Sequence, residues 1–230
     1  MAKNSITWNN FDSYSQQSLG LAKAVESSIR QLLDKQERVV LCVPGGSTPA
    51  EFFQVLSEVP IEWSRVTVLL NDERWVPLDH PQSNEAMLRK NLQRQAAKKV
   101  NIVSFYSPNL SIDEGVEAFN RQYSNVFPLD ICVLGMGTDG HTASIFPDME
   151  SLDHAINLDQ EPALIVSNVP DKEPRVSLNL SALLTSNRHY LLIRGEEKKK
   201  VLERAASKAI PLLPVSYVLA AANTHPFYAA

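Results

Sequence analysis

The sequence predicts a doubly wound α/β fold, in which helices cover both faces of a mostly parallel sheet. Short apolar runs alternate with longer segments whose apolar residues recur at helical spacing. The apolar runs show little polar alternation, as expected of strands that are buried on both faces. The chain has 230 residues, of which 44% are hydrophobic, and we therefore expect a single Rossmann-like domain over residues 1–230.

The elements follow in order along the chain. The first is a long amphipathic helix over residues 12–35, because apolar residues recur there every three or four positions. Helical patterns return at residues 49–58 and 83–95. Continuous apolar runs predict strands of the parallel sheet at residues 39–43, 66–70, 102–105, 129–134, 163–166 and 189–193. Residues 147–161 follow neither pattern and are expected to form an irregular surface insertion or lid.

The charge balance argues against nucleic acid as a main partner. The 22 basic and 26 acidic residues give a net charge of −4, whereas binding of a phosphate backbone favours a basic surface. No apolar stretch approaches the ~20 residues needed to cross a bilayer, and the N-terminus lacks a cationic region followed by an apolar core. Cys42 and Cys132 lie in apolar runs and are predicted to be buried free thiols. We therefore expect a cytoplasmic protein without membrane contact.

The loop after the first predicted strand has the composition of a phosphate cradle. In open parallel sheets, ligands bind beyond the carboxyl ends of the strands, where helices begin. Here Gly45 and Gly46 allow close backbone approach, and Ser47 and Thr48 supply hydroxyl groups. The alternative is an ordinary turn capped by Ser47 or Thr48. No Gly-Lys-Ser/Thr follows, so this is not a Walker loop.

Charged residues follow the second predicted strand. Asp72, Glu73 and Arg74 stand where a buried run ends, which is typical of a salt-bridged strand end. The functional alternative makes Arg74 an anion ligand and Asp72 its orienting partner or a base. Ser83 and Asn84 begin the next predicted helix and are expected to cap it.

The third loop, LGMGTDGHTAS, is the richest in chemistry. Residues 135–140 contain G-x-G-x-x-G after a strand, the pattern of a dinucleotide site. We disfavour that interpretation, because Asp139 would face the pyrophosphate, Pro147 follows closely, and the unit lies mid-chain. The alternative is a backbone pocket that presents His141 with Asp139 two residues before it. A carboxylate beside an imidazole fixes its tautomer and raises its basicity, as general base catalysis requires.

Two further cations lie late in the chain. Arg175 is in an apolar, strand-like setting where an unpaired guanidinium is costly, so it needs an anion from the protein or a ligand. Lys198 begins a run of three lysines whose default interpretation is a solvated helix face. The remaining histidines lack comparable neighbours and are expected to be surface or structural residues: His80, His154, His189 and His225.

The motifs GGSTP, NDERWVP, SN, LGMGTDGHTASIFP, PRVSL and GEEK, in this order, strongly resemble the 6-phosphogluconolactonase family. The resemblance covers residues 39–201, and DGHTASIFP is its most specific part. Members hydrolyse 6-phospho-D-glucono-1,5-lactone to 6-phosphogluconate in the oxidative pentose phosphate pathway. They share a fold with the glucosamine-6-phosphate deaminases, which read Asn-Glu-Pro where this chain has Ile145-Phe146-Pro147, and Tyr in place of Arg74. These differences point to the lactonase branch.

The resemblance also implies roles for individual residues. His141 is the expected base that activates water, supported by Asp139 and Asp72, and the oxyanion donors are expected from Arg74 or the backbone of residues 135–140. For Lys198 the resemblance reverses the default interpretation. The expected substrate-binding residues are Gly45, Gly46, Ser47, Thr48, Arg74, Gly137, Arg175 and Lys198.

The resemblance implies a small-molecule sugar-phosphate lactone as partner. A δ-lactone is an activated ester, so its hydrolysis requires no metal or cofactor, and we expect a monomer or a weak homodimer. One departure is the C-terminus, which reads HPFYAA where related lactonases often have a Trp-x-Asp-like segment. The resemblance therefore does not say which residues form the C-terminal wall of the site. The alternatives are a glucosamine-6-phosphate deaminase, a non-enzymatic sugar-phosphate sensor and an NAD-binding oxidoreductase. The sensor needs a DNA-binding module, and none is evident in the sequence.

Overall fold

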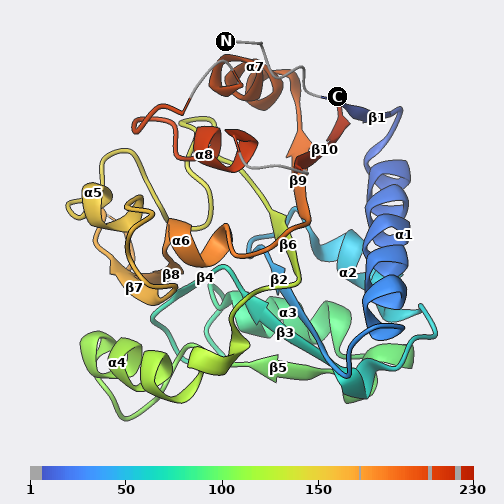
Figure 1. Ribbon diagram of the computed structural model, residues 1–230, viewed down its shortest axis with the longest axis horizontal. Coiled ribbons are helices and arrows are strands. Elements are labelled where there is room, and N and C mark those ends of the chain that lie inside the picture. The colour runs from blue at the N-terminus through green and yellow to red at the C-terminus, as the bar shows by residue number, and fades with distance from the viewer. Residues whose placement is uncertain (1–6, 171, 207–208, 221–223) are drawn as a thin grey trace.

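The computed structural model describes residues 7–170, 172–206, 209–220 and 224–230 (Figure 1). The main sheet consists of β1 (Asn9–Phe11), β2 (Val39–Val43), β3 (Val66–Leu70), β5 (Asn101–Val103), β6 (Ile131–Leu134), β9 (His189–Arg194) and β10 (Thr224–Ala229). Its strand order is β1-β10-β9-β6-β2-β3-β5, and every neighbouring pair is parallel. The predicted α/β fold with a mostly parallel sheet is confirmed.

The helices lie on both faces of this sheet. Between β1 and β5 the chain moves across the sheet in one direction, and right-handed crossovers therefore put α1 (Tyr14–Leu33), α2 (Ala50–Ser57) and α3 (Asn84–Leu92) on one face. After β5 the direction reverses. The helices of this second part are α4 (Ile112–Gln122), α5 (Leu152–Ala155), α6 (Leu180–Leu183), α7 (Glu196–Ala205) and α8 (Val215–Ala220). The reversal makes the neighbouring strands β2 and β6 a topological switch point, where ligands bind in such folds.

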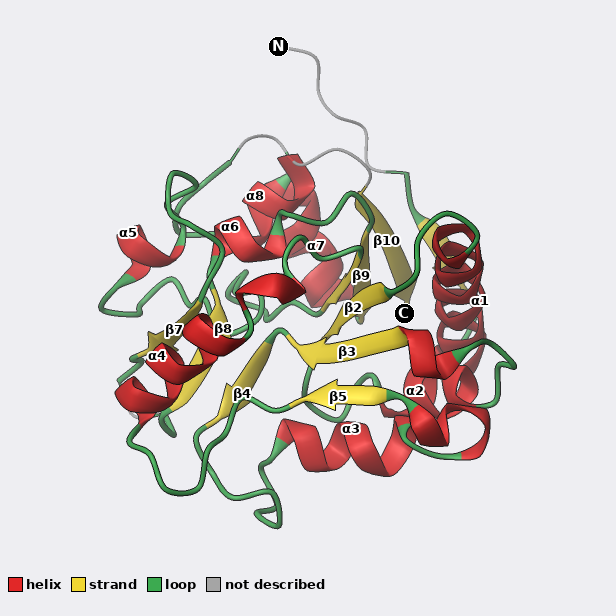
Figure 2. Ribbon diagram, turned by 60° about the horizontal axis from the view of Figure 1, so that its bottom comes forward, coloured by secondary structure: helices red, strands yellow, loops and turns green. Residues whose placement is uncertain are grey.

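One predicted strand belongs to a different sheet. The run at residues 163–166 becomes β7 (Leu164–Ser167), which pairs antiparallel with β8 (Arg175–Leu178). Strand β8 also pairs antiparallel with β4 (Asp72–Arg74), so the three form a small second sheet beside α4 (Figure 2). The prediction that this run joins the parallel sheet is wrong, because an apolar run predicts a buried strand and does not specify its partner.

The expected insertion at residues 147–161 is anchored in the core. It contains α5 between turns, and Met149, Ala155 and Ile156 are buried in the hydrophobic cluster. The HPFYAA terminus also has a structural place, because it lies in β10 between β1 and β9. Cys42 and Cys132 are buried free thiols, as predicted, and face one another in the register of β2 and β6.

No helix within the described residues is both long enough and apolar enough to span a membrane. Of the histidines expected to be structural, His189 is buried and its Nε2 lies 3.0 Å from the Leu183 carbonyl oxygen. His154 lies exposed in α5.

Candidate active site

A cavity of about 220 Å³ lies beyond the carboxyl ends of β2 and β6, at the switch point. Most residues predicted for the site line it: Gly45, Gly46, Thr48, Asp72, Arg74, Gly137, His141, Arg175 and Lys198. Asp139 adjoins the cavity through His141, whereas Ser47 and the C-terminal strand are not among the lining residues. The fold therefore brings together residues from all three predicted loops and both late cations.

The His141 ring is held by Asp139. Nδ1 of His141 lies 2.6 Å from Oδ1 of Asp139, and the same oxygen accepts the His141 backbone N–H at 3.1 Å. Partial burial raises the pKa of Asp139, but the two hydrogen bonds and the charge of His141 together lower it by more, so the net shift is downward. Asp139 is therefore an ionised acceptor that orients the imidazole.

The glycines of this loop shape it around the imidazole. Gly140 has a φ of +84°, and a Cβ there would meet Leu213 at 2.5 Å. The Gly137 N–H donates to the His141 carbonyl at 3.0 Å, and the Gly140 N–H donates to the Gly137 carbonyl at 3.1 Å. Both N–H groups are used inside the loop. The expectation that this backbone supplies oxyanion donors is therefore wrong for these two residues.

Gly137→Ala should reduce activity while the protein stays folded. A Cβ at Gly137 would lie 2.2 Å from both Cε1 and Nδ1 of His141, so the ring must move from its place against Asp139. Misplacing a reacting group by about 1 Å costs on the order of 100-fold in rate. The matched control is Gly135→Ala, because a Cβ there meets only Pro44, at 4.0 Å. Steady-state kinetics and thermal unfolding of both variants check this, and equal kinetics in the two would contradict it.

Two arginines face one another across the small sheet. Arg74 in β4 and Arg175 in β8 are register partners, and both line the cavity. Like charges at directly opposite positions destabilise a strand pair. Burial lowers the pKa of Arg175 most, and the charge of Arg74 lowers it further. Nε of Arg74 is buried and finds no hydrogen-bond partner within the described part of the chain. This pair therefore has unused capacity to bind an anion.

The three charged residues of β4 point alternately to opposite faces of the small sheet. Asp72 and Arg74 point to the cavity side, whereas Glu73 is buried on the other side against the start of α3. Oδ2 of Asp72 accepts a hydrogen bond from Oγ of Ser144 at 2.6 Å. The described residues show no ion pair among Asp72, Glu73 and Arg74, so the interpretation as a salt-bridged strand end is wrong.

The glycine loop after β2 opens onto the cavity without a side-chain cap. The N-cap of α2 is Pro49, which makes no capping hydrogen bond, so neither Ser47 nor Thr48 caps this helix. Gly46 has a φ of +79°, and its N–H donates to Oδ1 of Asn84 at 3.0 Å. Asn84 was expected to cap α3, but the Ser83 hydroxyl does so, accepting from the Ala86 N–H.

Lys198 reaches the cavity from the first turn of α7. It is half-buried, and burial lowers its pKa, while the charges of Asp139 and Glu197 oppose that shift. The interpretation as a solvated helix face is therefore wrong for Lys198, although it holds for the exposed Lys200. The described residues contain no cluster of three or more His, Cys, Asp or Glu side chains that could hold a metal ion.

Comparison with known proteins decides the family. The model of the family "Glucosamine-6-phosphate isomerases/6-phosphogluconolactonase" matches residues 13–226. The chain belongs to this family. Within it, a 6-phosphogluconolactonase of Pseudomonas aeruginosa is 37% identical, over 84% of this chain and 82% of that protein. A 6-phosphogluconolactonase of Mesorhizobium japonicum is 35% identical, over 95% of this chain and 92% of that protein.

Solved structures of the family have the same fold. The crystal structure of a 6-phosphogluconolactonase from Shewanella baltica has a TM-score of 0.93 and 32% identity, and covers 100% of both chains. A monomeric glucosamine-6-phosphate deaminase has a TM-score of 0.80 at 16% identity, covering 97% of both chains, and so shares the fold alone.

Several cavity residues were not predicted as part of the family's site. Asn71, Ser144 and Phe146 come from the ends of the motifs already quoted, and the sequence offered no sign of which way their side chains point. The ring of Phe146 lies against the His141 ring, with centroids 4.1 Å apart.

Proposed function

We propose that this chain is a carboxylic ester hydrolase that converts 6-phospho-D-glucono-1,5-lactone to 6-phospho-D-gluconate in the oxidative pentose phosphate pathway. The observation that carries the proposal is a single cavity where the His141–Asp139 pair lies with Arg74, Arg175 and Lys198. A base beside a cluster of cations suits a substrate with both a hydrolysable ester and an anionic group. The relatives named 6-phosphogluconolactonase support the same assignment.

His141 acts as the base. A carboxylate only accepts hydrogen bonds, so the ring proton of His141 lies on Nδ1, facing Asp139, and Nε2 is free to take a proton. Nε2 takes that proton from a water molecule as the water oxygen attacks C1 of the lactone. It returns the proton to the ring oxygen when the bond between C1 and that oxygen breaks. One water is consumed, and the products are a carboxylic acid, which ionises, and a free hydroxyl.

The cations of the cavity bind two different anionic groups, the phosphate of the substrate and the oxyanion that forms during the reaction. Arg175 and Lys198 hold the phosphate, together with the loop that contains Ser47 and Thr48. Arg74, which lines the cavity, donates to the oxyanion that develops on the C1 oxygen, where a preorganised donor is most effective. Binding energy from the remote phosphate then holds C1 against the attacking water.

The second candidate, glucosamine-6-phosphate deamination, lacks its acid. Phe146 is buried against His141 at the position of the deaminase Glu, and a phenyl ring cannot exchange a proton. Arg74 likewise replaces the deaminase Tyr. The cavity therefore favours hydrolysis.

The deciding experiment generates the lactone in situ and follows its disappearance. Because the lactone also hydrolyses spontaneously, the expected result is a rate above that background which rises in proportion to protein concentration. Ammonia release from glucosamine 6-phosphate is measured in parallel and should be absent. Ammonia release without lactone loss would assign the deaminase activity instead.

We also propose that the chain acts as one domain in the cytoplasm, as a monomer or a weak homodimer, without nucleic acid. One continuous cluster of buried hydrophobic residues supports the single domain. Light scattering over a range of concentrations tests the assembly.

A further inference from the structure

The buried carboxylate of Glu73 is a part of this molecule that the proposed chemistry does not use. Its side chain is only 1% exposed. Burial raises its pKa, and hydrogen bonds from the backbone N–H groups of Asn84, Glu85 and Arg74 partly offset that shift. Burying a carboxylate is costly unless hydrogen bonds compensate it, and at Glu73 four donors do so.

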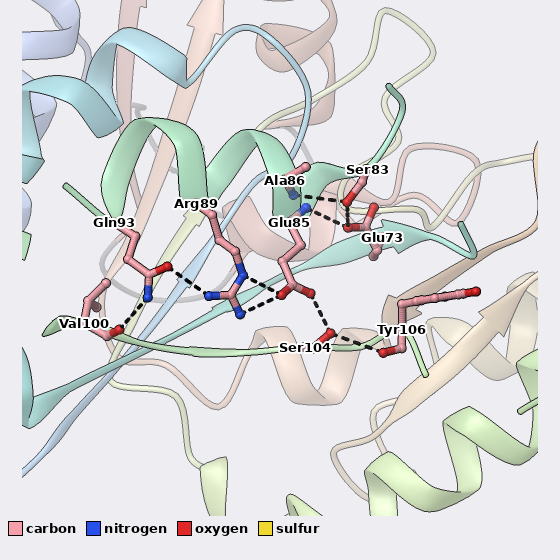
Figure 3. Close-up of polar contacts among 9 residues, drawn as sticks. All are labelled: Glu73, Ser83, Glu85, Ala86, Arg89, Gln93, Val100, Ser104 and Tyr106. Carbon is pink, nitrogen blue, oxygen red and sulfur yellow. Dashed lines mark hydrogen bonds and ion pairs between the residues drawn. The ribbon is translucent and has the colours of Figure 1, made fainter. Parts of the chain in front are cut away.

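The two oxygens of Glu73 connect β4 to the start of α3. Oε1 accepts the backbone N–H of Arg74 at 2.7 Å and that of Asn84 at 2.8 Å. Oε2 accepts a hydrogen bond from the N–H of Glu85 at 2.7 Å and from the hydroxyl of Ser83 at 3.2 Å, and both contacts are drawn in Figure 3. A single oxygen thus fixes the backbones of two residues that both line the cavity.

The side chain of Asn84 extends this connection to the glycine loop. Its Oδ1 accepts the Gly46 N–H at 3.0 Å, and its Nδ2 donates to the Asp72 carbonyl at 3.1 Å. Asn84 is 3% exposed, and a Cβ on Gly45 would lie 2.1 Å from its side-chain amide. Asn84 therefore packs between the loop after β2 and the strand β4.

We propose that Glu73 is a positioning residue that, through the backbones of Asn84 and Arg74, holds the glycine loop and the arginine pair in one fixed arrangement around the substrate. Glu73 itself does not line the cavity. Only its full acceptor set keeps both cavity residues in place. For its kinetic readout the inference rests on the lactonase activity proposed above.

Glu85 offers a matched control. It is also buried, at 5% exposure, and its backbone N–H donates to Glu73, but it does not line the cavity. Its carboxylate bonds to Arg89 and Ser104 (Figure 3). Glu85→Gln removes a buried charge from the first turn of α3, where Asn84 also lies, and leaves the side chains of Glu73 and Asn84 unchanged. Glu73→Gln replaces one acceptor oxygen by an NH₂ group that faces N–H donors.

The first readout is amide hydrogen exchange at Gly46. Gly46 is exposed, so its amide is protected by the hydrogen bond to Asn84. Exchange should be faster in Glu73→Gln and in Asn84→Ala than in the wild type, and unchanged in Glu85→Gln. This readout does not depend on any catalytic activity, so it stands even if the chain has no lactonase activity.

The second readout is steady-state kinetics with the lactone. Glu73→Gln and Asn84→Ala should lower kcat/KM on the order of 10- to 100-fold, whereas Glu85→Gln should keep the wild-type value even where it lowers the Tm. If Glu73→Gln does not fold, Glu73→Asp takes its place, because it keeps the charge but cannot reach both donor pairs. Wild-type Gly46 exchange in the folded Glu73 variant, or equal kinetic losses in the Glu73 and Glu85 variants, overturns the proposal.

Discussion

His141→Ala lowers kcat for the lactone on the order of 10²- to 10⁴-fold, the usual contribution of a general acid–base group, and leaves KM nearly unchanged. The substitution removes the base at Nε2 but none of the cations that bind the substrate. The loop itself should persist, because its backbone hydrogen bonds, such as Gly137 N–H to the His141 carbonyl, do not involve the imidazole. Steady-state kinetics measure the split between kcat and KM.

The matched control is His154→Ala. His154 is an exposed histidine of α5 outside the cavity, so its loss should leave both constants unchanged. Asp139→Asn should retain binding but lower kcat, because an amide no longer fixes the Nδ1–H tautomer. A His141→Ala variant that raises KM and retains kcat would show that the imidazole binds the substrate and takes no part in proton transfer.

Arg175→Ala and Lys198→Ala each raise KM for the lactone by about 10- to 100-fold, since a hydrogen bond to a charged group contributes about 1.5–3 kcal/mol. Both side chains are half-buried at the cavity, so water screens them less than it screens surface cations. Part of the loss can fall on kcat, because phosphate binding also positions C1. Kinetics and calorimetric titration with 6-phosphogluconate check the effect.

Lys200→Ala is the control for this prediction. Lys200 lies two residues further along α7, is exposed and does not line the cavity. The Lys200→Ala substitution therefore removes the same charge as Lys198→Ala without changing the cavity. Its KM should equal that of the wild type. If Lys198→Ala and Lys200→Ala behave alike, the effect is one of net charge, and Lys198 has no place at the phosphate.

Much of the catalytic loop was predictable because its geometry is local. Asp139 and His141 are two residues apart, and Gly137 and Gly140 allow the turn that brings them together. The motif therefore predicted the contact between the two side chains. The β2 and β3 strands were equally predictable, because runs buried on both faces are continuous in sequence.

The arginine pair and the Glu73 network could not be predicted, because they depend on which strands pair. Arg74 and Arg175 are far apart in the sequence and become neighbours only in the antiparallel register of β4 and β8. The direction of Glu73 follows from that same strand, since alternate residues point to opposite faces. The prediction that residues 163–166 join the parallel sheet failed for the same reason, and the capping role of Asn84 failed because its side chain bonds to Gly46 and Asp72, which are distant in the sequence.

By itself the sequence predicted the helices α1 to α3, the strands β2, β3, β5, β6, β7 and β9, the parallel core and the local Asp139–His141 pair. Helix and strand periodicity and short-range turns depend on neighbouring residues, so a sequence pattern reveals them. The tertiary structure decided which cations share the cavity, how Asn84 joins two loops, and that Lys198 faces the site and not solvent. These features depend on long-range strand pairing and burial, and no local pattern encodes them.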